Sequence, residues 1–223
     1  MRVICIVASA GKGKRLGLRK DKPFVELGGK PILARTLKVI EECSFIDGII
    51  VVVARGKLKA CEMLVKKHGI RKVMAIVTGG RRRFDSVRNA LARAKDADYI
   101  MIHDGARPFI DPKSIKKVFF AARKFGASLP AVPLKQTPKF VDKKLFIKKT
   151  PDRRFLWEAQ TPQIFKAGLI QEAYRKAPDR NATDDSILLE RLGHRVKIVT
   201  GPARNIKITT PEDLKLAEAL LKK

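Results

Sequence analysis

The chain has 223 residues, of which 45% are hydrophobic, and its 49 Lys and Arg against 22 Asp and Glu give a formal net charge of +27. This length fits one large α/β domain with a substantial core. Its longest apolar runs are strand-sized and no leader-like segment precedes them, so we expect a cytoplasmic protein without a membrane span. Its three cysteines and three histidines form neither a disulfide framework nor a zinc motif.

The positive charge suggests nonspecific binding to polyanions, and it makes a basic RNA-binding protein an alternative function. The cations are nevertheless spread along the whole chain, which has only 11 Phe, 2 Tyr and 1 Trp. No helix-turn-helix, zinc-finger or aromatic RNA-recognition motif accompanies them. We therefore expect most of these charges to be solvated, with a minority serving anionic substrates.

The first predicted element is an apolar strand at residues 3–8, followed by a glycine-rich cationic loop that ends near Lys22. A run of β-branched residues without polar alternation is typical of a parallel strand covered on both faces. Gly11 and Gly13 let backbone N–H groups approach a ligand that a Cβ would obstruct. With the neighbouring cations they predict a polyphosphate site, and an ordinary strand-to-helix connection is the alternative.

The spacing of this loop separates it from two common phosphate-binding motifs. An ATPase P-loop needs Ser or Thr after Gly-Lys, and none follows any Gly-Lys pair here. A dinucleotide-binding fingerprint needs Gly or Ala where Leu16 stands and an acid where Arg55 stands. We therefore expect the loop itself to wrap the phosphates.

Strand-like runs and helical patterns then alternate along the chain. The expected strands are residues 49–54, 73–77, 99–103 and 128–132, and the expected helices are residues 32–42, 57–68, 85–94 and 112–125. This alternation predicts an α/β fold, a doubly wound and mostly parallel sheet with helices on both faces. Polar loops follow the first, third and fourth strands, so we expect all three to meet at one cleft.

The pattern changes at residues 135–149, which predict two short strands around an Asp-Lys-Lys turn. Isolated hairpins are marginally stable in water, and this one carries five large apolar side chains. We expect a partner subunit to cover it, and folding back onto its own domain is the alternative. The whole chain, residues 1–223, is predicted to be a single domain with this hairpin arm at about residues 135–155.

The remaining segment predicts further helices, strands and a capped final helix. The expected elements are helices at residues 167–176 and 184–192, strands at residues 196–200 and 205–208, and a last helix from Pro211. Thr210 is the predicted N-cap of this last helix, with Pro211 at its first position and acids in its first turn.

An ordered series of motifs over essentially the full length resembles the 2-C-methyl-D-erythritol 4-phosphate cytidylyltransferases of the non-mevalonate isoprenoid route. The motifs that carry the resemblance are Ala8-Ser9-Ala10-Gly11-Lys12-Gly13-Lys14-Arg15, Lys22-Pro23-Phe24, Thr78-Gly79-Gly80, Asp85-Ser86-Val87, His103-Asp104-Gly105-Ala106-Arg107-Pro108, Thr150-Pro151-Asp152-Arg153, Trp157-Glu158-Ala159-Gln160-Thr161-Pro162-Gln163, Thr183-Asp184-Asp185 and Asn205-Ile206-Lys207-Ile208-Thr209. The resemblance implies a Rossmann-like nucleotidyltransferase that transfers CMP from CTP to methylerythritol phosphate and releases pyrophosphate.

The resemblance also implies a cofactor and a partner. Mg²⁺ or another divalent cation is expected mainly on the CTP phosphates, with no protein ligand assigned and Asp104 as a candidate. The hairpin arm is expected to reach into a second subunit of a homodimer, so that the active site is shared. Ribitol 5-phosphate cytidylyltransferases are the nearest alternative, because only the polyol pocket differs.

Site residues follow from the matching positions of the family pattern. Arg15 and Lys22 are expected to stabilise the transition state, and Arg153 and Lys207 to hold the phosphate of the second substrate. The nucleotide is expected against Ala8, Ser9, Ala10, Gly11, Gly13, Gly80, Arg81 and Ser86. The second substrate is expected beside Asp104, Arg107, Thr137, Thr161 and Thr183.

Several of these residues have a structural alternative. Asp104 and Arg107 suit an ion-paired turn, Thr161 suits the end of a strand, and Thr183 suits a helix N-cap. The chain also departs from the family pattern, with Arg81 at a usually acidic position and Ser9 and Gly105 each in place of a common Ala.

Overall fold

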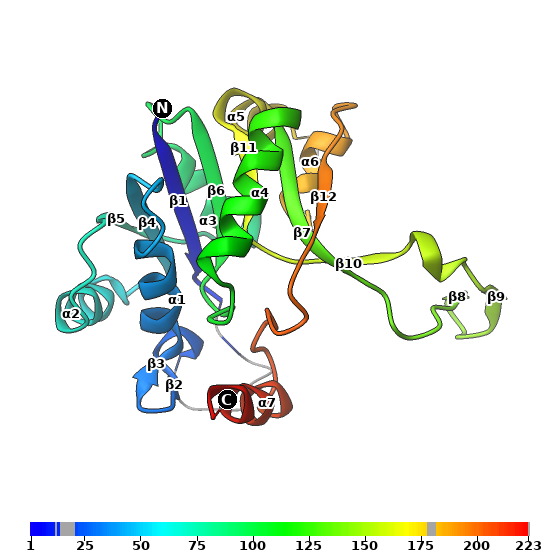
Figure 1. The fold of residues 1–223 in the computed structure, drawn as a ribbon, viewed down its shortest axis with the longest axis horizontal. Coiled ribbons are helices and arrows are strands. Elements are labelled where there is room, and N and C mark those ends of the chain that lie inside the picture. Colours follow the sequence, from blue (N-terminus) through cyan, green and yellow to red (C-terminus); the bar gives the residue numbers. More distant parts are fainter. Residues whose placement is uncertain (12, 14–20, 178–181, 223) are drawn as a thin grey trace.

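The computed structural model describes residues 1–11, 13, 21–177 and 182–222. Within these residues the central sheet has eight strands in the order β10-β7-β11-β6-β1-β4-β5, with β12 paired to β7 (Figure 1). Its strands are β1 (Val3–Ser9), β4 (Gly48–Val53), β5 (Val73–Thr78), β6 (Tyr99–Asp104), β7 (Ala127–Pro133), β10 (Trp157–Ala159), β11 (Gln163–Lys166) and β12 (Lys197–Thr200).

Most strand pairs of this sheet are parallel, which confirms the predicted doubly wound fold. Strand β1 lies between β4 and β6 and runs parallel to both, as β5 does to β4 and β12 to β7. Only β10 and β11 run antiparallel to their neighbours. The carboxyl ends of β1, β4, β5 and β6 therefore share one edge of the sheet.

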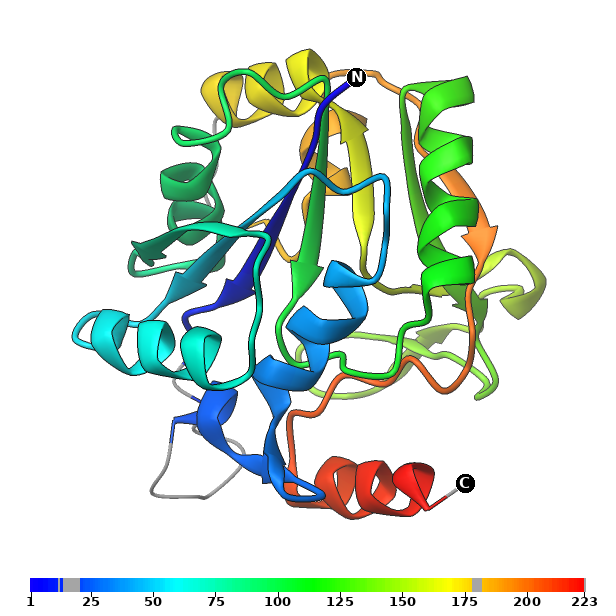
Figure 2. The ribbon, with the colours of Figure 1, turned by 60° about the vertical axis from the view of Figure 1, so that its left-hand side comes forward.

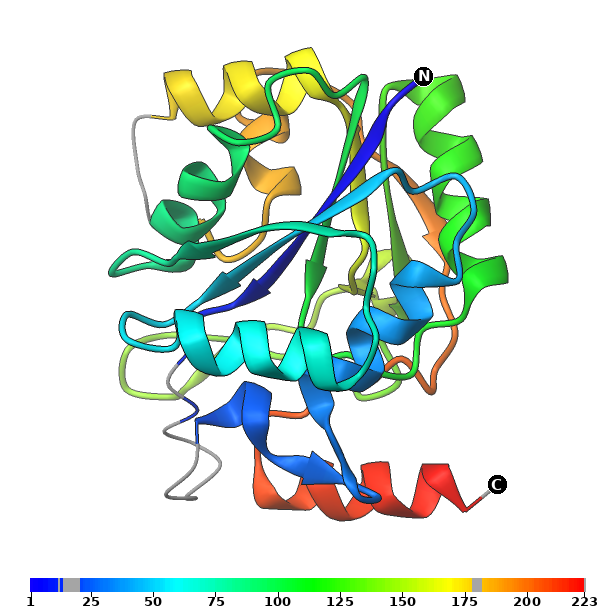
Figure 3. The ribbon, with the colours of Figure 1, turned by 90° about the vertical axis from the view of Figure 1, so that its left-hand side faces the viewer.

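Helices cover both faces of the sheet (Figures 2 and 3). One face carries α1 (Ile32–Glu41), α2 (Leu58–Lys67) and α4 (Pro112–Phe125), and the other carries α3 (Arg83–Leu91), α5 (Ala167–Lys176) and α6 (Ser186–Glu190). Successive residues of β1 point to opposite faces. Cys5 and Val7 therefore pack with the first helix set, and Ile4 and Ile6 with the second.

A small substructure lies below the carboxyl edge of the sheet (Figure 3). It consists of the 3-10 helix η2 (Lys22–Phe24), the short ribbon of β2 (Glu26–Leu27) and β3 (Lys30–Pro31), and the final helix α7 (Pro211–Leu221). Leu27, Ile32, Phe109, Ile208 and Ala217 form its buried core. The predicted Thr210 cap is confirmed, because a capping box with Asp213 begins α7.

The hairpin arm projects from the body of the molecule and does not fold back onto it (Figure 1). It contains β8 (Phe140–Val141), β9 (Ile147–Lys149) and the 3-10 helix η3 (Arg153–Phe155). Leu145 is 79% exposed, Phe146 70% and Phe155 78%. The arm therefore presents apolar side chains that nothing in the described chain covers.

Two predictions from the C-terminal segment need correction. Residues 205–208 do not form a strand: they lie beside the loop after β6, with the N–H of Ile208 donating to the carbonyl of Ala106 at 2.9 Å. Helix α6 begins at Ser186 rather than at Asp184, because the Asp184 carboxylate accepts the N–H of Ile187 from outside the helix. In the described part of the chain, no helix is both long and apolar enough to span a membrane.

Candidate active site

The three polar loops predicted to converge line one cavity of about 480 Å³ at the carboxyl edge of the sheet. Residues from the end of β1, from the loop after β5 and from the loop after β6 form its wall. The lining residues are Ala8, Ser9, Ala10, Gly11, Lys22, Pro23, Gly80, Arg81, Arg82, Arg83, Ser86, Asp104, Gly105, Ala106 and Lys207. Most of the predicted nucleotide site is thus brought together, while Arg15 lies outside the described residues.

Two glycines leave room for the side chains of neighbouring residues, and one of them, Gly80, lines the cavity. Gly13 has a φ of 63°, and a Cβ there would lie 2.8 Å from the Cβ of Lys22. A Cβ on Gly80 would lie 2.3 Å from the Cβ of Asp85. The hydroxyl of Ser86 accepts the N–H of Gly80 at 3.1 Å, which fixes this second turn. The turn at Gly80 therefore presents backbone rather than a side chain to a ligand.

The acidic residue of the cavity, Asp104, has a strongly perturbed pKa. Its side chain is 8% exposed, and its carboxylate lies 2.8 Å from Nζ of Lys207, 3.4 Å from Nε of Arg107 and 3.7 Å from Nε of Arg83. Burial alone would raise the pKa of this carboxyl, but Lys207, Arg83 and Arg107 together hold its pKa well below the usual range. Asp104 is therefore ionised at neutral pH and orients the cations that surround it.

Arg83 is a site residue that sequence reasoning missed. It donates two hydrogen bonds to Asp185, at 2.8 and 2.6 Å, while its Nε faces Asp104. The hydroxyl of Tyr174 donates to the same Asp185 at 2.6 Å. Burial alone would lower the pKa of the Arg83 guanidinium, but Asp185 raises it above its ordinary value. The sequence shows Arg83 only as the last of three consecutive arginines, a pattern typical of a solvated surface, and so gave no signal for its role.

Thr161 and His103 form a buried support behind Asp104. The Thr161 hydroxyl accepts the N–H of Asp104 at 3.0 Å and lies 3.0 Å from Nδ1 of His103. The Thr161 hydroxyl already accepts a hydrogen bond from Asp104, so we assign it as the donor to Nδ1 of His103. The ring hydrogen is then on Nε2, which donates to the Arg107 carbonyl at 3.1 Å. Burial lowers the pKa of His103 to about 4, so this ring is neutral and structural. Thr161 is not part of the cavity wall.

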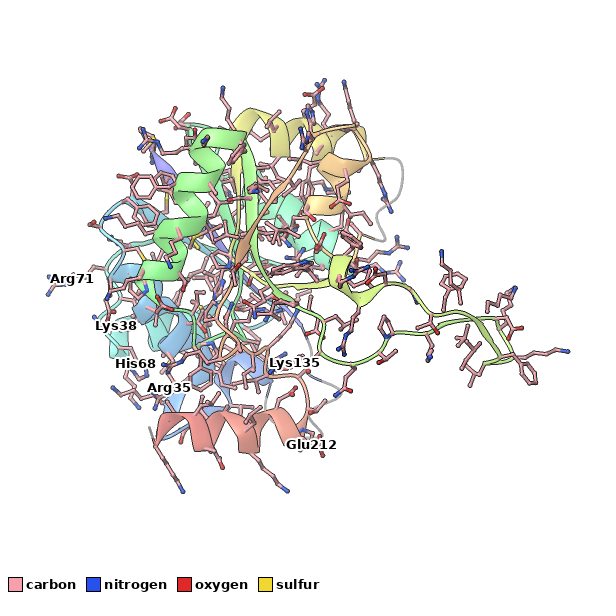
Figure 4. All side chains as sticks on the ribbon, turned by 45° about the vertical axis from the view of Figure 1, so that its right-hand side comes forward. Arg35, Lys38, His68, Arg71, Lys135 and Glu212 are labelled. Atoms are coloured by element: carbon pink, nitrogen blue, oxygen red, sulfur yellow. The ribbon has the colours of Figure 1, made fainter. Side chains whose placement is uncertain are left out.

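Besides Thr161, five predicted residues are not among those that line the cavity: Gly13, Arg107, Thr137, Arg153 and Thr183. Arg153 and Thr137 belong to the arm, where Nη1 of Arg153 donates to the carbonyl of Lys135 at 3.0 Å. Figure 4 shows the side chains of the arm standing clear of the body. Thr183 is exposed and precedes α6 without capping it. Within one chain, therefore, the arm residues do not meet Asp104 and Lys207.

The cavity offers one carboxylate to a cation. Asp104 is the only acidic residue among the described residues that line it, and this part of the chain contains no cluster of three His, Cys, Asp or Glu side chains. Mg²⁺ usually binds one or two carboxylates together with substrate phosphates. The residues present therefore fit a cation held mainly by a bound triphosphate, but not a cage made by protein alone.

Comparisons with known proteins agree with this geometry. A family model described as 2-C-methyl-D-erythritol 4-phosphate cytidylyltransferase matches residues 3–223. A protein of that name from Alkaliphilus metalliredigens is 45% identical over 99% of this chain and 93% of its own length. Another, from Dehalococcoides mccartyi strain 195, is 46% identical over 100% of this chain and 97% of its own length.

Solved structures show the same fold. The 4-diphosphocytidyl-2C-methyl-D-erythritol synthase of Anaerococcus prevotii superposes with a TM-score of 0.88 at 32% identity, covering 100% of this chain and 96% of that one. The 2-C-methyl-D-erythritol 4-phosphate cytidylyltransferase of Thermus thermophilus gives a TM-score of 0.80 at 30% identity, covering all of both chains. The similarity thus extends over the arm as well as the body.

Proposed function

This chain belongs to the 2-C-methyl-D-erythritol 4-phosphate cytidylyltransferase family, and on that premise we propose which of its residues transfer CMP from CTP to methylerythritol phosphate. The observation that carries the assignment of residues is that the motifs after β1, β5 and β6, together with Lys22 and Lys207, line one cationic cavity. The family match and the names of the relatives favour neither the RNA-binding alternative nor the ribitol phosphate alternative.

The reaction brings two anions together, so charge neutralisation and alignment are the main requirements. A phosphate oxygen of methylerythritol phosphate attacks the α-phosphorus of CTP, and the bond from that phosphorus to the β-phosphate oxygen breaks. The bonding electrons leave with pyrophosphate. Lys22, on the cavity wall, neutralises charge that develops on the phosphates, and Arg15 is assigned the same role from the family pattern.

The cytosine lies against the turn after β5 in this proposal. The Ser86 hydroxyl is already engaged with Gly80 and with the carbonyl of Arg82 at 3.0 Å, so it stabilises the turn. Backbone groups of Gly80 and Arg81, with those of residues 8–10, are then left to select the base. This arrangement tolerates Arg81 at a position where the family usually has an acid.

The second substrate lies on the β6 side of the cavity. Lys207, which pairs with Asp104 at 2.8 Å, is placed to exchange that carboxylate for the substrate phosphate. When bound, Mg²⁺ would neutralise triphosphate charge, and Asp104 is the residue that would hold it. Arg107 keeps this region ordered through its hydrogen bond to the carbonyl of Asn205 at 2.8 Å.

Arg153 and Thr137 reach an active site only across a homodimer in this proposal. Support comes from the exposed apolar arm and from the absence of both residues from the cavity of their own chain.

We also assign the protein to the cytoplasm, since Cys5, Cys43 and Cys61 are free thiols that suit a reducing compartment. Nonspecific polyanion binding is expected from the net charge of +27.

Mixing two inactive variants tests the shared site. Lys22→Ala damages the cavity of its own chain, and Arg153→Ala removes only what its arm contributes. If the arm serves the partner, each mixed dimer regains one intact site, and random mixing restores about a quarter of the wild-type activity. Mixing Lys22→Ala with Lys207→Ala is the matched control, because both changes lie in the cavity of their own chain and a mixed dimer then has no intact site. If Arg153 acts within its own chain, the first mixture instead restores no more than the weighted mean of the two variants.

Substrate choice is tested separately by pyrophosphate release. With CTP and Mg²⁺, methylerythritol phosphate should react much faster than ribitol 5-phosphate. The reverse preference would overturn the substrate assignment while leaving the nucleotide site intact.

A further inference from the structure

A second cavity, of about 520 Å³, lies outside the nucleotide pocket. Helix α1, the residues after α2, the segment of residues 108–112 and the end of α7 form its walls. A Cβ on Gly28 would lie 2.7 Å from Leu221 and 2.9 Å from Arg35, so α7 and α1 approach closely there. Neither the family pattern nor the proposed reaction uses this cavity.

The lining of this second cavity is amphiphilic. Its apolar wall includes Ala34, Val39, Ile70, Phe109, Ile110 and Leu221. Its basic side chains are Lys30, Arg35, Lys38, His68 and Arg204. Figure 4 shows Arg35, Lys38 and His68 along the same edge of the molecule. A hydrocarbon group with an anionic end matches this combination of surfaces.

The charge of the cavity is not balanced by its own acid. Among the described residues of the wall, Asp111 is the single carboxylate, and it accepts both the N–H and the hydroxyl of Ser114 at 2.8 Å as the N-cap of α4. Lys38 pairs with Glu41 at 3.3 Å, but no carboxylate of the described residues pairs with Lys30 or Arg204. The field inside the cavity therefore favours an anion.

Arg35 is the most fixed cation of this cavity. Its Nε donates to the carbonyl of Leu27 at 2.6 Å, and its Nη2 donates to that of Gly28 at 2.7 Å. Burial lowers the pKa of this guanidinium, and its partners in the described chain are neutral carbonyl groups rather than carboxylates. A pre-positioned guanidinium of this kind suits a phosphate group.

The wall of the second cavity is continuous with the active site. Pro108 follows Arg107, and Arg204 precedes Asn205, whose carbonyl accepts Nη1 of Arg107 at 2.8 Å. The N–H of Ile208 binds the carbonyl of Ala106 at 2.9 Å, next to the pair of Asp104 and Lys207. A ligand held between the two segments would stiffen the groups that carry this ion pair.

We propose that this cavity binds a small amphiphilic anion, a short hydrocarbon chain that ends in a phosphate. Occupancy lowers turnover, because it stabilises the pairing of Lys207 with Asp104 and so opposes capture of the substrate phosphate. The effect on turnover rests on the proposed role of Lys207. Binding itself does not depend on that role, and the two are measured separately.

Calorimetric titration of the full chain with octyl phosphate, below its micelle concentration and in saturating CTP, tests binding. We expect saturable binding at one site, at least about tenfold tighter than inorganic phosphate or octanol alone. CTP occupies the nucleotide side of the first cavity, so binding that persists comes either from the second cavity or from the side that takes the second substrate, which the variants below distinguish. No saturable binding, or equal binding of inorganic phosphate, would overturn the site.

Variants locate the site. Lys30→Gln with Arg204→Gln should weaken octyl phosphate binding by about tenfold, whereas Lys95→Gln, an exposed lysine at the opposite end of the sheet, should leave it unchanged. If both changes weaken octyl phosphate binding equally, the attraction is nonspecific and the proposal is refuted.

A kinetic measurement tests the effect on turnover. Octyl phosphate should lower kcat/KM at least about twofold in the wild type but not in the double variant. If octyl phosphate binds without lowering kcat/KM, the proposed site stands but its proposed coupling to Lys207 is wrong.

Discussion

The nucleotide cavity and the hairpin arm both carry residues of the family pattern, but the burial of these residues and their partners differ. In the cavity, Asp104 is 8% exposed and lies near three cations of its own chain. On the arm, Phe155 is 78% exposed, and the guanidinium of Arg153 reaches the backbone carbonyl of Lys135. The charged groups around Asp104 are paired within one chain, whereas the arm exposes side chains that the described part of the chain does not cover.

The difference has a physical reason. The cavity rests on buried strands and on helices that pack against both faces of the sheet, so that its charged groups are held in place. The arm is a ladder of two short strands, and an isolated two-stranded hairpin is marginal in water. Its conformation and its use should therefore depend on a second surface.

The largest expected effect lies in the cavity. Lys22→Ala removes a cation from the cavity wall and should lower kcat by ~10²–10³, the usual scale for loss of an oxyanion-stabilising donor, with little change in the free energy of unfolding. The family pattern predicts a loss of the same size for Arg15→Met. Steady-state kinetics with thermal unfolding measures both quantities, and Lys59→Ala, an exposed lysine on α2, is the control. Near-normal kcat in Lys22→Ala would contradict the role given to it.

Acidification should test the buried support of the cavity. Burial lowers the pKa of His103 to about 4, below the value of about 6.5 in an unfolded chain, so the unfolded state binds the proton first. Above pH 6.5 the ring is neutral in both states, and the contribution of neutral His103 to the free energy of unfolding is fully present. As the pH falls toward 4, the unfolded state binds the proton and the free energy of unfolding falls by about 3 kcal/mol. The Asp104 contribution is lost only at lower pH, because its pKa is depressed.

Urea unfolding at a series of pH values measures this loss. His103→Gln should remove most of the pH dependence in that window, and His194→Gln, at a less buried position, should retain it. NMR titration of the His103 ring gives an answer even if His103→Gln folds poorly. A ring that titrates near pH 6.5 would show that the site is open to solvent.

Phe146→Glu should separate the arm from the cavity. The side chain is 70% exposed, so the fold should be retained, but a charge at this position should weaken a dimer and lower activity by about tenfold in dilute solution. Sedimentation velocity and kinetics over a range of protein concentrations measure both effects. Phe120→Glu, which changes a residue 50% exposed on α4, is the matched control. A fully active monomer would end the shared-site proposal.

The smallest effect concerns two departures from the family pattern. The buried hydroxyl of Ser9 has no hydrogen-bond partner in the described chain, and a Cβ on Gly105 would lie 1.9 Å from its Oγ. Ser9→Ala should raise the free energy of unfolding by about 1 kcal/mol, and Gly105→Ala alone should lower it by about 1–3 kcal/mol. The double variant should recover stability. Additive effects in chemical denaturation would show that the two residues do not share this space.

Local elements were largely predictable because their signals lie within a few residues. Helices α4 and α5 begin and end where the periodicity predicts, and Thr210 caps α7 as its sequence indicates. The strand predicted at residues 205–208 failed, because an apolar alternation does not say whether a partner strand is available. The convergence of three polar loops was also predictable, since parallel strands place their carboxyl ends at one edge.

By itself, the sequence determined the alternation of strands and helices, the glycine turns and the family to which the motifs belong, because each depends on short-range pattern and residue type. Only the tertiary structure decided that Arg83 joins Asp185, 102 residues away, to Asp104, and that Arg153 is not part of the cavity that contains Lys207. Long-range pairing of charges depends on how the elements pack around a buried core. No local pattern specifies that arrangement.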